Sequence, residues 1–104
     1  MKAPKAPRHL SAEARRWFDE TTNDYSLEPQ HLKLLQAAAE AWDSCQKARK
    51  IVAKEGQIVH DRYDKPKSHP AVAIERDSRL AFARLVRELD LEGEPGPDPR
   101  LPRR

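Results

Sequence analysis

The feature of this sequence that most constrains its fold is a run without Pro or Gly between Pro29 and Gly56. Pro is well tolerated as the first residue of a helix, and Gly is common just past a helix end. Apolar side chains recur along the run every three or four residues. The run therefore predicts one helix over residues 29–55, about 40 Å long at about 1.5 Å per residue. Its predicted apolar stripe contains Leu35, Ala38, Trp42, Cys45, Ala48 and Val52, widened by Leu32, Leu34 and Ile51.

A helix of this length is longer than the average in globular proteins, so it needs extensive packing partners. Leu, Ile, Val and Phe together make up fewer than one residue in five of the 104, whereas charged residues make up 36%. The formal net charge is only +3, so the composition lacks the high net charge of disordered chains. We therefore expect a folded chain with a thin core that gains apolar burial by oligomerising, with part of the long helix packed across a subunit boundary.

A shorter helix is predicted before the long one. Ser11 can accept a hydrogen bond from a free N–H of the first turn, and Glu13 suits the positive end of the helix dipole. These signals predict a helix over residues 12–23, followed by a turn. Its apolar face is predicted to consist of Ala14, Trp17, Phe18, Thr21 and Tyr25.

A third helix is predicted to start at Pro70, with His69 in the N-cap region, and to end near Leu91, before Gly93. A capping role is the simplest explanation of the His-Pro pair. Arg76, Arg79, Arg84 and Arg87 are expected to face outward, whereas the predicted buried side consists of Val72, Ala73, Ile74, Ala81, Phe82, Leu85, Val86 and Leu89.

Residues 56–67 differ in character from the helical segments. Ile58 and Val59 favour an extended backbone, and Asp64-Lys65-Pro66 indicates a turn because the residue before Pro avoids the helical region. We predict a short β-hairpin or ordered loop here. The fold class is thus all-α: a small helical domain with a long central helix, this hairpin or loop before the third helix, and flexible termini.

The sequence gives little support to catalysis, a metal site or a cofactor. His9, His31, His60 and His69 do not fall at zinc-site spacings, and Cys45 is the single cysteine. His60-Asp61 is more simply a surface or loop pair than a catalytic one, and Cys45 a small apolar residue of the long helix. Three glycines cannot form a phosphate-binding loop. We expect no enzyme, no metal and no cofactor. We also expect no secretory signal and no membrane span, since no apolar run approaches 18 residues.

Charge is distributed unevenly along the chain. Residues 17–43 are acidic, whereas residues 44–67 are rich in Lys and Arg. Cations in the last turns of a helix stabilise its negative end by a few tenths of a kcal/mol each, and this structural role is one explanation. The other is contact with the phosphates of a nucleic acid. The candidate DNA-binding residues are Lys47, Arg49, Lys50, Lys54, Arg62, Lys65 and Lys67.

The order of these segments carries a resemblance. HLSAEARRWF, then LEPQHLKLLQAAAEAWDSCQKARKIVAKEG, then IVHDRYDKPKSHPAVAIERDSRLAFARLVRELDLEGEP together resemble the small terminase subunits of tailed bacteriophages, of the short helical type. The resemblance covers about residues 9–95. It rests on the combined order and spacing of the three segments, because none of them is a catalytic signature.

The resemblance implies a subunit that recognises double-stranded viral DNA at the packaging initiation site. It would assemble into a homo-oligomeric ring and deliver DNA to the large terminase subunit, an ATPase and nuclease, in the cytoplasm of the infected bacterial host. On this interpretation residues 1–9 are a flexible basic arm, residues 10–92 a helical oligomerisation and DNA-recognition domain, and residues 93–104 a disordered Pro-rich tail. DNA contact could use the basic patch, the arm or the tail.

Two alternatives stay open at this point. A helix-turn-helix DNA-binding regulator would need a turn of three or four residues before a short recognition helix. The long helix and the wide connection over residues 56–67 count against it. A protein-only assembly adaptor would instead dock through the acidic residues 17–43 without contacting DNA.

Overall fold

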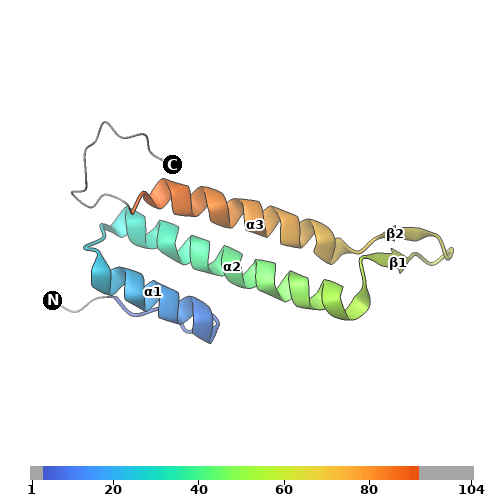
Figure 1. The fold of residues 1–104 in the computed structure, drawn as a ribbon, viewed down its shortest axis with the longest axis horizontal. Helices are drawn as coiled ribbons and strands as arrows, with labels where there is room; N and C mark the ends of the chain where they lie inside the picture. Colours follow the sequence, from blue (N-terminus) through green and yellow to red (C-terminus); the bar gives the residue numbers. More distant parts are fainter. Residues whose placement is uncertain (1–3, 92–104) are drawn as a thin grey trace.

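The structure is a computed structural model that describes residues 4–91, which form three helices and one β-hairpin (Figure 1). Its elements are α1 (Ala12–Asp24), α2 (Pro29–Glu55), β1 (Ile58–His60), β2 (Pro66–Ser68) and α3 (Pro70–Leu89). Helices α2 and α3 run antiparallel and side by side, and α1 lies along the N-terminal half of α2. The all-α class and the long central helix are confirmed, and the segment before α3 is a hairpin. The predicted tail over residues 93–104 lies outside the described residues.

Helix α2 has the predicted bounds because its two ends carry clear signals. Pro29 is at the start of the helix, where the missing N–H costs no hydrogen bond. The imidazole of His31 accepts the Glu28 backbone N–H at 3.4 Å. At the other end Gly56 has φ 86°, which favours glycine, and its N–H donates to the Val52 carbonyl at 2.7 Å.

The His-Pro pair is a helix start, as predicted. Nδ1 of His69 accepts the Ala71 backbone N–H at 2.9 Å, so the proton of the neutral ring lies on Nε2. Nε2 donates to Oε1 of Glu55 at 2.8 Å. One imidazole therefore caps α3 and ties its start to the end of α2.

The ends of the other helices follow from local backbone geometry. The Ser11 hydroxyl accepts the Ala14 N–H at 3.1 Å and caps α1, as predicted. Helix α1 continues to Asp24, one residue past the predicted end. Helix α3 ends at Leu89, two residues before the predicted end near Leu91, because Asp90 adopts the left-handed conformation, with φ 50° and ψ 53°.

The core lies at the end of the molecule where all three helices meet. Its buried members are Leu10, Ala14, Phe18, Leu35, Ala39 and Leu89. The rings of Trp17 and Trp42 both pack at a tilt against the ring of Phe82. Their centroids lie 5.7 and 5.1 Å, respectively, from the centroid of the Phe82 ring. The indole N–H of Trp42 donates to Oε1 of Glu13 at 3.1 Å, which fixes α1 on α2. Of the predicted stripe of α2, Leu35, Ala38, Cys45 and Ala48 are buried, and Trp42 and Val52 are half-buried.

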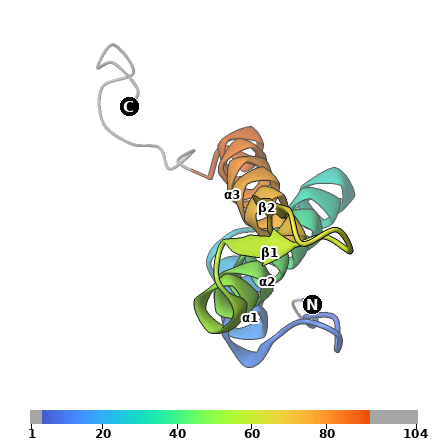
Figure 2. The ribbon, with the colours of Figure 1, turned by 90° about the vertical axis from the view of Figure 1, so that its right-hand side faces the viewer.

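Beyond the start of α1, helices α2 and α3 continue as a pair without a third helix. We call residues 44–80 the distal arm; the hairpin is part of it and forms its far end (Figures 1 and 2). The chain is correspondingly elongated, with a radius of gyration of 17.7 Å against about 13 Å for a compact domain of this size.

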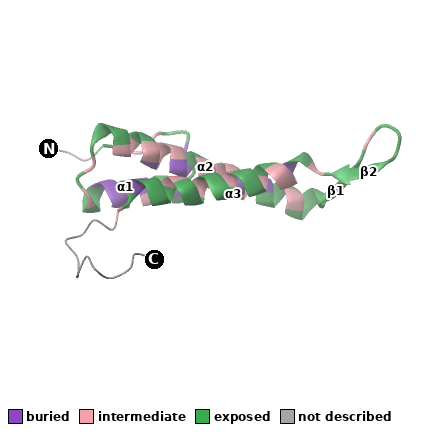
Figure 3. Ribbon diagram, turned by 90° about the horizontal axis from the view of Figure 1, so that it is seen from above, coloured by how far each residue is buried: buried purple, intermediate pink, exposed green. Residues whose placement is uncertain are grey.

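The predicted buried side of α3 is too wide. Ile74, Ala81 and Val86 are exposed, and so is Ile51 on α2. The physical reason is that α3 packs mainly against α2, and a single neighbouring helix covers only one seam of its surface. Figure 3 accordingly shows α3 exposed over most of the side in view. The buried residues of α3 are Ala71 and Leu89.

Replacing Trp42 with Ala should lower the free energy of unfolding by about 3 kcal/mol, the low end for removal of a core Trp, because the ring is half-buried. Trp42→Phe keeps an aromatic ring against Phe82 and should lose clearly less. Urea denaturation measures both values. An unchanged unfolding midpoint for the Ala variant would contradict the packing described for α2.

Replacing His69 with Ala should cost about 1 kcal/mol of stability, because the first turn of α3 loses its cap. Asn at this position can still cap the helix but cannot reach Glu55 in the same way. We expect His69→Asn to retain most of the stability in thermal unfolding. Equal losses for Ala and Asn would show that the link to Glu55, and not the cap, is what stabilises this end.

Candidate nucleic-acid interface

Three of the seven candidate cations share one face of α2. Lys47, Lys50 and Lys54 are spaced by three and four residues, so their side chains emerge on the same side of the helix. All three are exposed. We call them the lysine row. Along the helix axis the row spans about 10 Å, at about 1.5 Å per residue.

Three more cations of the predicted set lie in the hairpin, and all three are exposed. Lys67 is on β2 opposite Val59, and Arg62 and Lys65 are in the connecting loop. The Arg62 guanidinium lies 5.5 Å from the centre of the Tyr63 ring, which is 71% exposed. The lysine row and these three cations are all exposed on the distal arm, and we call them together the basic surface.

The hairpin loop has a defined shape. The Asp61 carboxylate accepts the backbone N–H groups of Tyr63 and Lys65 at 2.8 and 3.0 Å. The Asp61 N–H donates to the Lys65 carbonyl at 3.0 Å, and Asp64 adopts a positive φ of 62°. Asp side chains commonly stabilise turns in this way. The loop therefore presents its cations and its tyrosine from a fixed backbone.

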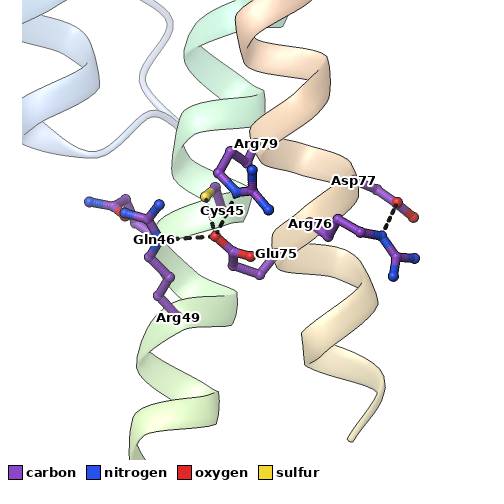
Figure 4. A network of polar contacts seen from close by, with 7 residues as sticks. All are labelled: Cys45, Gln46, Arg49, Glu75, Arg76, Asp77 and Arg79. Atoms are coloured by element: carbon purple, nitrogen blue, oxygen red, sulfur yellow. Dashed lines mark hydrogen bonds and ion pairs between the residues drawn. The ribbon is translucent and has the colours of Figure 1, made fainter. Parts of the chain in front are cut away.

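Arg49 is also exposed, and it forms an ion pair with α3. Its Nε is 3.1 Å from Oε2 of Glu75 on α3, and Arg79 approaches the same oxygen at 3.4 Å (Figure 4). The hydrogen bond from Arg49 is the main reason that the pKa of Glu75 is lowered. Arg49 and Arg79 thus share one carboxylate between the helices, so the charge of Arg49 is partly compensated within the chain.

Cys45 lies beneath this network and is almost fully buried. Burial raises the pKa of its thiol, and the Sγ atom is 3.6 Å from Oε2 of Glu75. The thiol stays protonated at neutral pH, whereas a reactive cysteine needs a lowered pKa and solvent access. These properties fit the predicted role as a small apolar residue of the α2 stripe.

Outside the basic surface, His9 and Glu40 form a polar contact between the N-terminal segment and α2. Nε2 of His9 lies 2.7 Å from Oε2 of Glu40. A hydrogen bond from Gln36 is the largest cause of the lowered pKa of Glu40. Within residues 4–91 no group of three or more His, Cys, Asp or Glu side chains is placed to hold a metal ion. No described helix is long and apolar enough to cross a membrane.

The described residues thus define a small elongated helical protein whose distal arm carries an exposed basic surface. Comparison with known families identifies it further: the family model described as "Phage terminase, small subunit" matches residues 12–94. The chain belongs to this family. Searches of curated proteins and of solved structures found no match.

Membership of the family gives the chain a role in phage DNA packaging. Subunits of this family are generally non-catalytic and bind DNA or regulate packaging. The family also implies partners within the packaging machinery, such as DNA and the large subunit, and action in the host cytoplasm during infection. The resemblance seen in the sequence is thereby confirmed.

Glu75, Arg79 and Tyr63 were not among the residues that the sequence predicted for the site. The spacing of Glu75 and Arg79, four residues apart on one helix, could have indicated their pair. The contact of Glu75 with Arg49 joins residues 26 positions apart and carried no local signal. The position of Tyr63 at the hairpin tip also depended on whether the segment formed a hairpin or a loop. The assignment of the seven cations to DNA contact stays a prediction.

Removing the Arg49 guanidinium should raise the pKa of Glu75 towards its ordinary value of 4.5. A carboxylate with a lowered pKa in the folded state contributes stability above its unfolded-state pKa. That contribution is lost as the pH falls through the lower folded-state value. Arg49→Met should therefore reduce stability at neutral pH and flatten its fall below pH 4.5. NMR titration of the Glu75 side-chain carboxyl carbon measures the shift, and an unchanged pKa would contradict the assigned cause.

Proposed function

We propose that this chain binds double-stranded viral DNA at the packaging initiation site and delivers it to the large terminase subunit, acting as a homo-oligomeric ring without catalytic activity of its own. The observation that carries the proposal is the family match over residues 12–94, which includes all seven candidate cations. The exposed basic surface on the distal arm supplies the chemistry that a polyanion requires.

The lysine row and the hairpin contribute differently to DNA binding. Lysine side chains on one helix face can contact successive phosphates, which adds affinity but carries no sequence information. A two-stranded β-ribbon has dimensions that the major groove of DNA admits. The hairpin projects beyond the helices and holds Arg62, Tyr63 and Lys65 at its tip. In this proposal the lysine row anchors the DNA backbone while the hairpin approaches the base edges.

Ring assembly would compensate for the small number of cations in one chain. The six cations of the basic surface give one copy only weak, salt-sensitive affinity. Several copies on one DNA molecule convert later contacts into intramolecular ones, so their affinities reinforce one another. The acidic segment over residues 17–43 belongs mostly to α1 and the first half of α2, away from the basic surface.

The test is a salt titration of binding to duplex DNA that contains the packaging initiation region. The triple variant Lys47→Glu, Lys50→Glu, Lys54→Glu should bind at least tenfold more weakly at about 0.1 M salt. Its slope of log affinity against log salt should be shallower by up to about 2.7 per copy, since each lost phosphate contact removes about 0.9.

The matched control reverses three exposed cations away from the basic surface: Arg15→Glu, Arg16→Glu, Lys33→Glu. It changes the net charge equally and should bind much more strongly than the lysine-row variant. Equal losses in both variants would point to net charge alone. No binding at low salt by an assembled parent protein would replace the proposal with the protein-only adaptor.

A further inference from the structure

An open groove lies between α2 and α3 next to the start of α1. It has a volume of about 340 Å³, and its apolar walls come from Ala48 and Ile51 of α2 and Ala71 and Ile74 of α3. Ile51 is 40% exposed and Ile74 is 49% exposed. Leu10, at the start of α1, closes one end of the groove. The groove is therefore the place in the distal arm where the three-helix packing stops and apolar side chains are left in water.

A second apolar feature lies on another face of α3. Leu80, in the middle of α3, is 56% exposed. Leu80 lies six positions after Ile74, which places the two side chains about 120° apart around the helix axis. Leu80 therefore cannot fill the groove of its own chain. It forms an apolar knob on a surface that points elsewhere.

The net charges around these two features are opposite. Arg76 and Arg84 lie four residues before and after Leu80 and both are exposed; Arg76 also pairs with Asp77 at 3.3 Å. The groove is lined by two carboxylates, Glu40 and Asp43, and by one cation of the lysine row, Lys47. Glu40 accepts a hydrogen bond from Gln36 and contacts His9, and its pKa is lowered, so it stays ionised at neutral pH. Asp43 accepts two hydrogen bonds from Ser11, which hold it at the groove.

We propose that Leu80 of one copy inserts into the groove of a second copy, between Ile51 and Ile74, with Arg76 and Arg84 beside the acidic side of that groove. The second copy is the occupant that charge complementarity favours, since one chain carries both a knob flanked by two arginines and a groove in which two carboxylates outnumber one lysine. The contact is heterologous, because knob and groove are different surfaces. Such contacts form rings when the rotation between copies closes.

This inference rests on the ring in the proposed function and specifies its interface. It also assigns a role to the apolar residues that sequence periodicity placed in the core of a single chain. Ile74 and Ile51 would be buried in the assembly, not in the monomer. The thin core and the elongated distal arm are then both consequences of a chain that completes its packing with a neighbour.

The experiment compares the mass in solution of the full-length parent with that of Ile74→Glu and Leu80→Glu. Light scattering coupled to gel filtration at micromolar concentration gives the mass. The parent should be several times the chain mass of 11.9 kDa, and each variant should be a monomer. Because both positions are about half exposed, each variant should keep the helical circular dichroism of the parent.

Mixing the two variants tests the direction of the contact. Ile74→Glu keeps an intact knob and Leu80→Glu keeps an intact groove. Their mixture should therefore contain a one-to-one heterodimer of twice 11.9 kDa and nothing larger. No heterodimer in the mixture would overturn the knob-and-groove pairing. A parent that is only a dimer would overturn the head-to-tail arrangement.

Two further measurements separate the possible failures. Ile58→Glu, at a hairpin position that is 56% exposed, is the matched control and should keep the parent mass. If either main variant fails to fold, the charge reversal Arg76→Glu, Arg84→Glu replaces it and should also dissociate the assembly. If the parent forms a large assembly and either Ile74→Glu or Leu80→Glu has the same mass as the parent, only this interface is overturned. A monomeric parent overturns the ring in the proposed function as well.

Discussion

The structure depends on the antiparallel seam between α2 and α3. It holds Trp42 against Phe82, and it places Glu75 between Arg49 and Arg79. The cap that His69 provides and its bond to Glu55 close the seam at the hairpin end. Without this seam, neither the hairpin nor the lysine row would have a fixed position, because both project from the helix pair and contact little else.

Helix α1 covers only part of this seam, and that asymmetry separates two kinds of surface. Where α1 packs, the chain has a conventional small core around Phe18 and Leu35. Where α1 is absent, apolar residues such as Ile74 remain exposed beside exposed cations. Groups with shifted pKa values, Glu40, Glu75 and Cys45, all lie in contacts between residues of the helices or between α2 and the N-terminal segment. These polar contacts hold the helices and the N-terminal segment in place. The proposed function depends instead on exposed surfaces that bind DNA and a second copy.

The local features of the fold could be predicted because each had a local physical cause. Pro29 and Gly56 bounded α2, Ser11 and His69 capped their helices, and the Asp64-Lys65-Pro66 turn marked the hairpin region. The left-handed Asp90 was missed because aspartate adopts this conformation far less regularly than glycine. For the candidate site, periodicity placed Lys47, Lys50 and Lys54 on one face. It could not place Arg49, whose partner is distant in sequence.

The sequence by itself determined where each helix starts and how long α2 is, because Pro, Gly and capping residues act within a few positions of the chain. Its segment order also indicated the phage terminase small-subunit family. Only the tertiary structure decided which apolar residues are buried. Periodicity shows that Ile74 and Leu80 lie on a helix, but burial depends on whether another helix covers them. In this chain α1 is too short to cover Ile74, and Leu80 lies on a face of α3 that no described helix covers, so both side chains stay exposed.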